Sequence, residues 1–205
     1  MLFDLDGVLV DTEGIYTRFW AAMGLEFGLA PTFASDIKGT TLTSILKYFP
    51  EDKRDYVVGR IHDFENDMPY DFFDGTERAI AELKRNGARL AIVTSSDDVK
   101  MGHLYARHPG FREMFDAIID ASMVTRSKPD PQGYLLAARE LGLDAKQCVV
   151  VEDSLQGLEA GRRSGAKVVG FTTTNSEEKV APLCDLCLPS IKFLTHKNII
   201  DLLLK

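Results

Sequence analysis

Short apolar runs alternate with helical patterns along most of the chain. Each run ends in small or polar residues, and the runs lie at residues 2–4, 89–96, 117–122, 147–154 and 166–171. Nearly continuous hydrophobicity over so few residues is typical of strands buried on both faces of a parallel sheet. The pattern therefore predicts five parallel strands.

Three segments between or after these runs have the apolar spacing of amphipathic helices: residues 75–87, 130–142 and 154–165. Gly87 is expected to end the first of these helices, and Ser154 is expected to be the N-cap of the third. Strands that alternate with helices predict an α/β fold, with a doubly wound, Rossmann-like parallel-sheet core.

Residues 14–74 differ from the rest of the chain, because no strand-like run appears there. Apolar side chains instead recur every four residues, as on one face of a helix: Ile15, Phe19, Met23 and Phe27. We therefore expect a small α-helical domain inserted after the first strand. On this interpretation residues 1–13 and 75–205 form the core, and residues 14–74 form the helical insert.

The composition excludes several classes of protein. Of the 205 residues 45% are hydrophobic and 27% are charged, which is ordinary for a globular protein. A formal net charge of −7 argues against a nucleic-acid partner, whose binding surface is usually basic. No apolar run approaches the roughly 18 to 20 residues that span a bilayer, so no membrane partner is expected. Three cysteines indicate no disulfide framework, so a reducing cytoplasm is the expected compartment. We also expect a monomer.

The N-terminus and the cysteine pair each allow one further expectation. Only two residues precede Phe3, fewer than a central strand usually has, which indicates that the sequence as given starts within its first strand. Aspartates interrupt any apolar stretch there, so no signal peptide is expected. Cys184 and Cys187 form C-x-x-C without a second pair, which favours packing near a last strand over a zinc site.

Polar side chains follow four of the predicted strands, where an open α/β sheet binds its ligands: Asp4, Asp6, Thr94, Ser95, Lys128, Glu152 and Asp153. Each has a purely structural explanation when it is taken alone. Asp6 with Gly7 is a common turn dipeptide, Thr94 and Ser95 could cap a helix, and acids such as Glu152 favour helix N-termini. Their shared position at the strand ends indicates a site.

The set of side chains is suited to phosphoryl transfer. Asp4 and Asp153 offer the oxygen ligands that Mg²⁺ prefers, and Lys128 and Thr94 would neutralise and hold a phosphoryl group. A carboxylate can attack phosphorus to form an aspartyl-phosphate. A second carboxylate nearby, such as Asp6, can act as acid and then as base.

Four motifs carry a resemblance to a known family: FDLDGVLVDTE, IVTSS, SKPDP and VVVEDSLQGLEAGRRSGA, in that order across residues 3–165. The sequence resembles the haloacid dehalogenase superfamily, in its β-phosphoglucomutase-like and phosphatase branch with a helical cap. The resemblance implies that Asp4 is the nucleophile and Asp6 the acid/base, whose backbone carbonyl also binds Mg²⁺. It further implies that Thr94 and Lys128 hold the phosphoryl group. Asp153 would ligate Mg²⁺ with support from Glu152, and residues 14–74 would be the cap.

Individual residues, the chain length and the helical cap distinguish the alternative functions. Dehalogenating members lack the second aspartate, which is present here as Asp6. A non-enzymatic phospho-receiver domain has about half this length and no cap. The β-phosphoglucomutase-type phosphomutase has a histidine in the first cap helix and an arginine in the cap loop, where this chain has Tyr16 and Leu42. We therefore favour a Mg²⁺-dependent phosphatase over the mutase.

The resemblance implies that the cap loop and first cap helix contact the substrate. The expected substrate-binding residues are Lys38, Thr40, Thr41, Tyr16 and Ser95. His62 either replaces a cap lysine or is a surface histidine. The implied substrate is a small phosphorylated metabolite such as a sugar phosphate, with pyrophosphate and nucleotides left open as alternatives.

Overall fold

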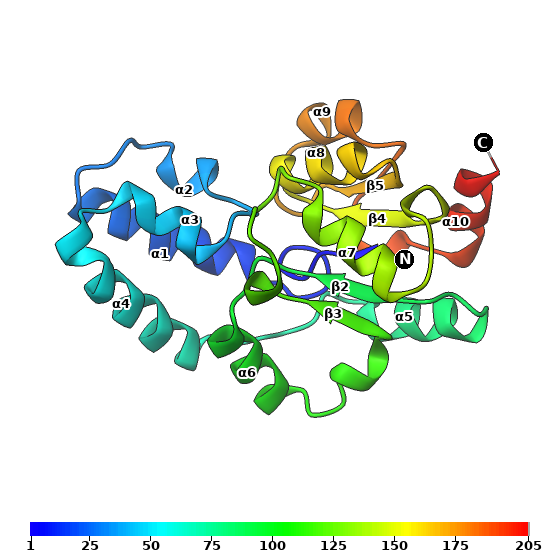
Figure 1. Ribbon diagram of the computed structural model, residues 1–205, viewed down its shortest axis with the longest axis horizontal. Coiled ribbons are helices and arrows are strands. Elements are labelled where there is room, and N and C mark those ends of the chain that lie inside the picture. Colours follow the sequence, from blue (N-terminus) through cyan, green and yellow to red (C-terminus); the bar gives the residue numbers. More distant parts are fainter. Residues whose placement is uncertain (205) are drawn as a thin grey trace.

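A computed structural model describes residues 1–204 of the chain. Six parallel strands form one sheet in the order β3-β2-β1-β4-β5-β6, with helices packed around it (Figure 1). The predicted α/β class with a parallel-sheet core is confirmed. The strands are β1 (Leu2–Phe3), β2 (Ala91–Val93), β3 (Ala117–Ile119), β4 (Val149–Glu152), β5 (Lys167–Phe171) and β6 (Leu186–Leu188).

The α-helices are α1 (Glu13–Glu26), α2 (Phe33–Asp36), α3 (Leu42–Ile45), α4 (Arg54–Asp67), α5 (Thr76–Arg85), α6 (Asp98–Arg107), α7 (Gln132–Glu140), α8 (Leu155–Ser164), α9 (Glu177–Val180) and α10 (His196–Leu203). Short 3₁₀ turns lie at Leu46–Tyr48, Glu51–Lys53, Arg112–Met114, Ala121–Met123, Ala145–Gln147, Ala181–Leu183 and Ile191–Phe193. None of these helices is both long and apolar enough to span a membrane, among the residues described.

The sheet is buried on both faces because successive strand residues point to opposite sides. Leu2 packs in one apolar cluster, with residues of α7 and α8, whereas Phe3 packs in the other, with residues of α5 and α10. Both side chains are fully buried. This two-sided burial is the reason that the strands read as continuous apolar runs in the sequence.

The predicted helices around the sheet are present, with local signals at their ends. Ser154 is the N-cap of α8, and its hydroxyl accepts a 3.0 Å hydrogen bond from the Gly157 N–H. Gly87 and Gly165 follow α5 and α8 with φ of 80° and 84°, which favours glycine. One strand was not among the five predicted runs: β6 is a half-buried edge strand whose apolar run is only three residues long, between Asp185 and Pro189. Cys187 lies in it and Cys184 precedes it.

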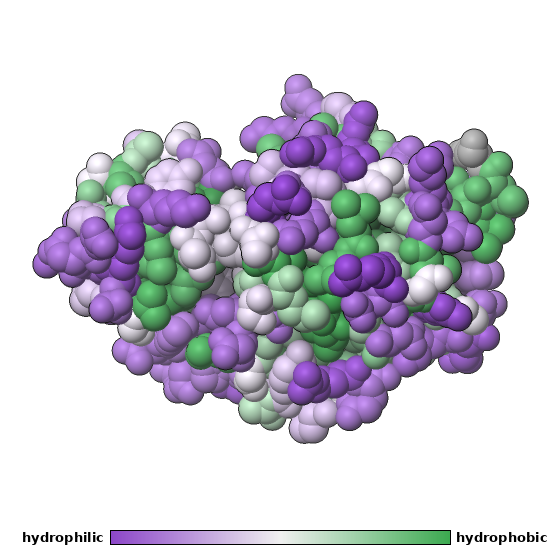
Figure 2. All heavy atoms as spheres, viewed as in Figure 1, coloured by the Kyte–Doolittle hydropathy of each residue, from purple (hydrophilic) through white to green (hydrophobic). Residues whose placement is uncertain are grey.

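Helices α1–α4 form a second, purely helical part that lies to one side of the sheet (Figure 1). Its own apolar cluster combines aromatic and aliphatic side chains, and the rings of Phe19 and Phe64 stack at 4.6 Å between centroids. In the view of Figure 2 the surface is mostly hydrophilic, and a notch separates this part from the rest. The exact limits of a cap at residues 14–74 stay a prediction.

The order of the strands in the sheet indicates where a ligand would bind. The chain leaves β1 with β2 on one side and β4 on the other, so the carboxyl ends of these three strands flank a point where the strand order reverses. Ligands of open α/β sheets bind in the crevice at such a point.

Candidate active site

The segment after β1 forms a tight turn that holds two aspartates at the end of the sheet. The Asp4 N–H donates to the Val151 carbonyl at 3.0 Å, which extends the pairing between β1 and β4 by one residue. Gly7 then adopts a φ of 77°, and its N–H donates to the Val10 carbonyl at 2.9 Å. The turn returns the chain to α1, so that Asp4 and Asp6 line the same cavity.

Lys128 links Asp4 to Glu152 inside the protein. Its ammonium donates to Asp4 Oδ1 at 2.5 Å, to Glu152 Oε1 at 2.7 Å and to the Val93 carbonyl at 3.1 Å. Burial raises the pKa of Asp4 to about 8, although the Lys128 charge opposes this shift. Burial lowers the pKa of Lys128, but Asp4 and Glu152 outweigh it, so the net pKa is raised and the ammonium stays charged. The sequence-predicted Asp4 and Lys128 are therefore in direct contact.

Glu152 is fully engaged by hydrogen bonds. Its Oε1 also accepts from the Tyr134 hydroxyl at 2.8 Å, and its Oε2 accepts from the N–H groups of Asp153 and Ser154 and from the Ser154 hydroxyl. The side chain is 0% exposed. Glu152 lies within the acidic group formed with Asp4 and Asp153, but its contacts fit a residue that positions Lys128.

Asp153 has the opposite environment. Both of its carboxylate oxygens are buried, and neither has a hydrogen-bond partner within the described residues. Burial raises the pKa of Asp153 well above the usual range, and the nearby Glu13, Glu152 and Asp4 raise it further. A Cβ on Gly7 would overlap Asp153 Oδ2, so only a glycine allows this close approach.

These residues fit a hard divalent cation. Asp4, Glu152 and Asp153 offer carboxylate oxygens within 4.8 Å of one another. Two partnerless, buried oxygens on Asp153 are otherwise costly, and an oxygen-binding cation such as Mg²⁺ would offset that cost. The set of ligands therefore agrees with the predicted Mg²⁺ site.

Asp6 is held by donors from two further elements. Its carboxylate accepts hydrogen bonds from the Thr12 hydroxyl, from the Ser96 hydroxyl at 3.1 Å and from the Lys100 ammonium at 2.6 Å. Thr12, Ser96 and Lys100 were not among the residues predicted from the sequence. The burial of Lys100 beside Met101 in α6 is visible only in the structure, so no sequence signal marks this lysine.

The strand-end hydroxyls have separate partners. Thr94 Oγ1 donates to the Ser96 hydroxyl at 2.9 Å and accepts from the Ser96 N–H at 3.1 Å. The Ser95 hydroxyl donates to the Gly39 carbonyl at 2.8 Å, and thus joins the end of β2 to the loop before α3. Neither caps α6, whose N-cap is Asp97.

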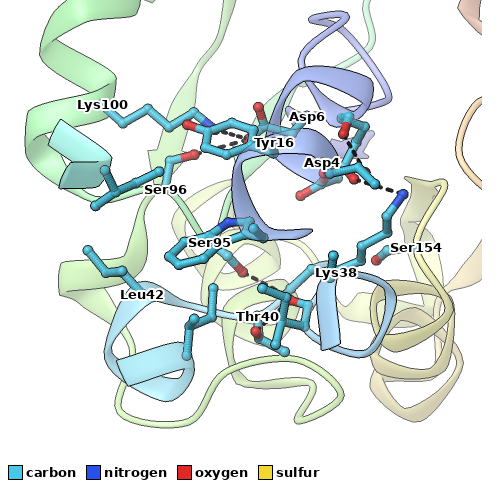
Figure 3. Close-up of a pocket in the computed structure, with 18 of the residues that line it drawn as sticks. Asp4, Asp6, Tyr16, Lys38, Thr40, Leu42, Ser95, Ser96, Lys100 and Ser154 are labelled. Atoms are coloured by element: carbon cyan, nitrogen blue, oxygen red, sulfur yellow. Dashed lines mark hydrogen bonds and ion pairs between the residues drawn. The ribbon is translucent and has the colours of Figure 1, made fainter. Parts of the chain in front are cut away.

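The helical part contributes the other side of the cavity, as Figure 3 shows for Tyr16, Lys38, Thr40 and Leu42. Lys38 forms an ion pair with Glu13 at 3.4 Å. The Tyr16 hydroxyl donates to Glu65 Oε1 at 2.6 Å, and the Tyr16 ring lies 4.3 Å from the Lys100 ammonium.

Two residues considered as substrate contacts, Thr41 and His62, do not line the main cavity. Thr41 is buried and lines a smaller neighbouring pocket together with Thr94 and Lys128. His62 lies 3.4 Å from Asp97 at the boundary between α4 and α6, where Glu65 is also close. The main cavity is lined by side chains from both the helical part and the ends of the strands.

Comparison with known proteins agrees with this geometry. Residues 1–165 match the family of haloacid dehalogenase-like hydrolases. Because the match covers most of the chain, the protein belongs to this family of hydrolases, as the four motifs predict.

Relatives and solved structures extend the likeness over nearly the whole chain. Hexitol phosphatase A of Escherichia coli (strain K12) is 31% identical over 203 residues, which cover 95% of this chain and 92% of that protein. A CbbY mutant from Rhodobacter sphaeroides, solved in complex with xylulose-(1,5)bisphosphate, is 27% identical with a TM-score of 0.73 and covers 94% of both chains. β-Phosphoglucomutase from Clostridium difficile shares the fold, with a TM-score of 0.80 at 23% identity over 98% of this chain and 95% of that one.

Some relatives are much longer. The chain spans about half (54%) of the bifunctional riboflavin kinase/FMN phosphatase of Arabidopsis thaliana, to which it is 26% identical. It spans 18% of the chloroplastic protein SUPPRESSOR OF QUENCHING 1 from the same plant.

Proposed function

We propose that the protein is a Mg²⁺-dependent phosphatase that hydrolyses a small phosphate monoester through an aspartyl-phosphate on Asp4. One observation carries the proposal: the buried Asp4 contacts Lys128 and lies beside Asp153, whose carboxylate oxygens have no hydrogen-bond partner within residues 1–204. This arrangement supports a nucleophile that faces a cation site and a phosphate-neutralising lysine.

The first step forms a bond between a carboxylate oxygen of Asp4 and phosphorus and breaks the ester P–O bond. Asp6 gives a proton to the departing oxygen, in an orientation held by Thr12, Ser96 and Lys100. Lys128 neutralises charge on the transferring group. Mg²⁺ bound by Asp153, Asp4 and the Asp6 backbone carbonyl would supply further charge neutralisation.

The second step hydrolyses the aspartyl-phosphate. Asp6, now a carboxylate, takes a proton from water, whose oxygen bonds to phosphorus while the bond to Asp4 breaks. Inorganic phosphate leaves and both aspartates return to their initial states. Closure of residues 14–74 over the site would limit the access of water until the leaving group has gone.

The proposed substrate class is a sugar phosphate or a related polyol phosphate. A relative that is a named hexitol phosphatase and a cavity lined by hydroxyl, lysine and carboxylate side chains support this class. A monomeric, cytoplasmic enzyme stays a prediction.

Asp4→Asn tests the mechanism. We expect it to abolish turnover of p-nitrophenyl phosphate and of sorbitol 6-phosphate with the fold retained by circular dichroism, because the nucleophile is lost. Asp63→Asn makes the same chemical change at an exposed position on α4 and should leave turnover unchanged. Activity that survives Asp4→Asn would refute the mechanism.

Phosphorus NMR with β-glucose 1-phosphate, Mg²⁺ and a trace of the 1,6-bisphosphate separates hydrolysis from mutase action. We expect inorganic phosphate to accumulate. Growth of glucose 6-phosphate without free phosphate would identify a phosphomutase instead.

A further inference from the structure

Glu65 is a buried acid that the proposed chemistry does not use. It lies in α4, its side chain lines the active-site cavity, and the residue is 5% exposed. Oε1 accepts the hydrogen bond from Tyr16, but Oε2 is buried without a hydrogen-bond partner in the described part of the chain. Burial raises the pKa of Glu65, although Lys100 and the Tyr16 hydrogen bond oppose this shift. A buried carboxylate oxygen without a hydrogen-bond donor is unfavourable, so Glu65 Oε2 is an acceptor that lacks a partner.

Glu65 is linked to the acid/base only through other side chains. Lys100 contacts Asp6 at 2.6 Å and lies over the Tyr16 ring at 4.3 Å, and Tyr16 in turn donates to Glu65. Within the described residues no hydrogen bond or ion pair joins Glu65 directly to Asp4, Asp6 or Lys128. The leaving group of the ester, rather than its phosphate, would extend towards Glu65.

The end of the cavity at Glu65 offers little positive charge. Both lysines that line it are already paired, Lys38 with Glu13 and Lys100 with Asp6. No arginine lines the cavity within residues 1–204. The remaining charged side chains at this end are Glu65 and Asp97, and the histidine next to them, His62, already contacts Asp97.

We propose that the cavity selects phosphate monoesters whose leaving group presents a hydrogen-bond donor to Glu65 and carries no second anionic group. This inference rests on the proposed phosphatase function. A hydroxyl or ammonium group would give the Glu65 carboxylate the partner it lacks, whereas a carboxylate or second phosphate would meet two acids without a free cation. The selection would distinguish this chain from the CbbY relative that was solved with a bisphosphate.

A matched pair of substrates tests the selection. Sorbitol 6-phosphate and 6-phosphogluconate differ only at C1, which is a hydroxymethyl group in the first and a carboxylate in the second. We expect kcat/KM for sorbitol 6-phosphate to exceed that for 6-phosphogluconate by at least about tenfold. Glucosamine 6-phosphate against glucose 6-phosphate then identifies whether an ammonium or a hydroxyl is the preferred donor.

Glu65→Gln should reduce the tenfold ratio to about threefold or less, because the amide can donate to the carboxylate while it keeps an acceptor for Tyr16. The ratio is taken within each variant, so a general loss of activity cancels. Asp63→Asn, on the same helix but exposed, should keep the wild-type ratio. Equal kcat/KM values in the wild type, or a ratio unchanged by Glu65→Gln, would overturn the inference.

The phosphatase activity and the substrate selectivity can be refuted separately. Turnover of p-nitrophenyl phosphate that needs Mg²⁺ and Asp4 supports the phosphatase whatever the selectivity is. If no ester is hydrolysed, calorimetric binding of the same two sugar phosphates decides: tighter binding of sorbitol 6-phosphate supports the inference while the phosphatase fails, and equal binding refutes the inference too.

Discussion

Two adjacent acids, Glu152 and Asp153, have opposite environments although the sequence presents them as a pair. Both carboxylate oxygens of Glu152 accept protein hydrogen bonds, whereas both oxygens of Asp153 are buried and have no partner in the described part of the chain. The difference arises at the end of β4, where the first side chain points into the core beside Lys128 and the second faces Gly7. The contacts therefore favour a positioning role for Glu152 and leave Asp153 as the proposed metal ligand.

Asp153→Asn should have opposite effects in the absence and presence of Mg²⁺. Without metal, we expect a higher melting temperature at neutral pH, because the amide is uncharged, whereas the buried and unpartnered carboxyl must take up a proton to lose its charge. With metal, the rise in melting temperature caused by Mg²⁺ should be lost. Thermal melts in EDTA and in Mg²⁺ measure both effects, and a variant that retains the full Mg²⁺-induced rise would contradict the assignment of Asp153 as a ligand.

Glu152→Gln should weaken the response to Mg²⁺ less than Asp153→Asn does. Loss of a residue that orients a metal site typically costs about 10- to 100-fold in affinity or activity, so we expect a weakened but measurable Mg²⁺ response. Magnesium titrations of turnover should thus rank wild type, Glu152→Gln and Asp153→Asn in order of decreasing affinity.

At the scale of elements, Ser154 has two roles that can be separated. Its hydroxyl accepts from the Gly157 N–H at the start of α8 and donates to Glu152 Oε2 at 3.0 Å. Thr195 caps α10 in the same way, far along the chain from the site, by accepting from the Asn198 N–H. The two caps form a natural control pair.

Ser154→Ala and Thr195→Ala should each lower the free energy of unfolding by about 1 kcal/mol, the usual cost of a lost N-cap. Only Ser154→Ala should also lower kcat, because it removes a hydrogen bond to the residue that holds Lys128. Urea denaturation and steady-state kinetics measure the two effects. Equal kcat losses in both variants would show that the effect comes from stability alone.

The elements differ in how far the sequence predicts them. Strand ends at Asp4, Thr94 and Asp153 were predictable, because burial on both faces leaves an apolar run that stops at the site. The contact of Lys100 with Asp6 was not, because it joins positions 94 residues apart and depends on how α6 packs. The Tyr16 bond to Glu65 likewise depends on the packing of α1 against α4, which periodicity does not specify.

At the scale of the whole molecule, the net charge of −7 is concentrated in part around the cavity, where acids outnumber lysines. Burial raises the pKa of Asp4 to about 8 and also raises that of Asp153. In the metal-free protein the folded state therefore holds protons on these carboxyls at a pH where the unfolded chain has released them. Unfolding then releases protons, so stability falls as pH rises.

The stability gained from Mg²⁺ should consequently increase with pH. In EDTA, we expect the free energy of unfolding to rise as the pH is lowered from about 8 towards about 5, because the folded pKa values lie above the unfolded value of about 4. Saturating Mg²⁺ replaces those protons, so the slope should flatten and the difference between the two conditions should be largest near pH 8. Urea denaturation at several pH values, with and without metal, measures this difference directly. Groups remote from the site contribute equally to both series and cancel, so a Mg²⁺ gain that is constant across this range would mean that the metal binds somewhere other than the Asp4 and Asp153 carboxylates.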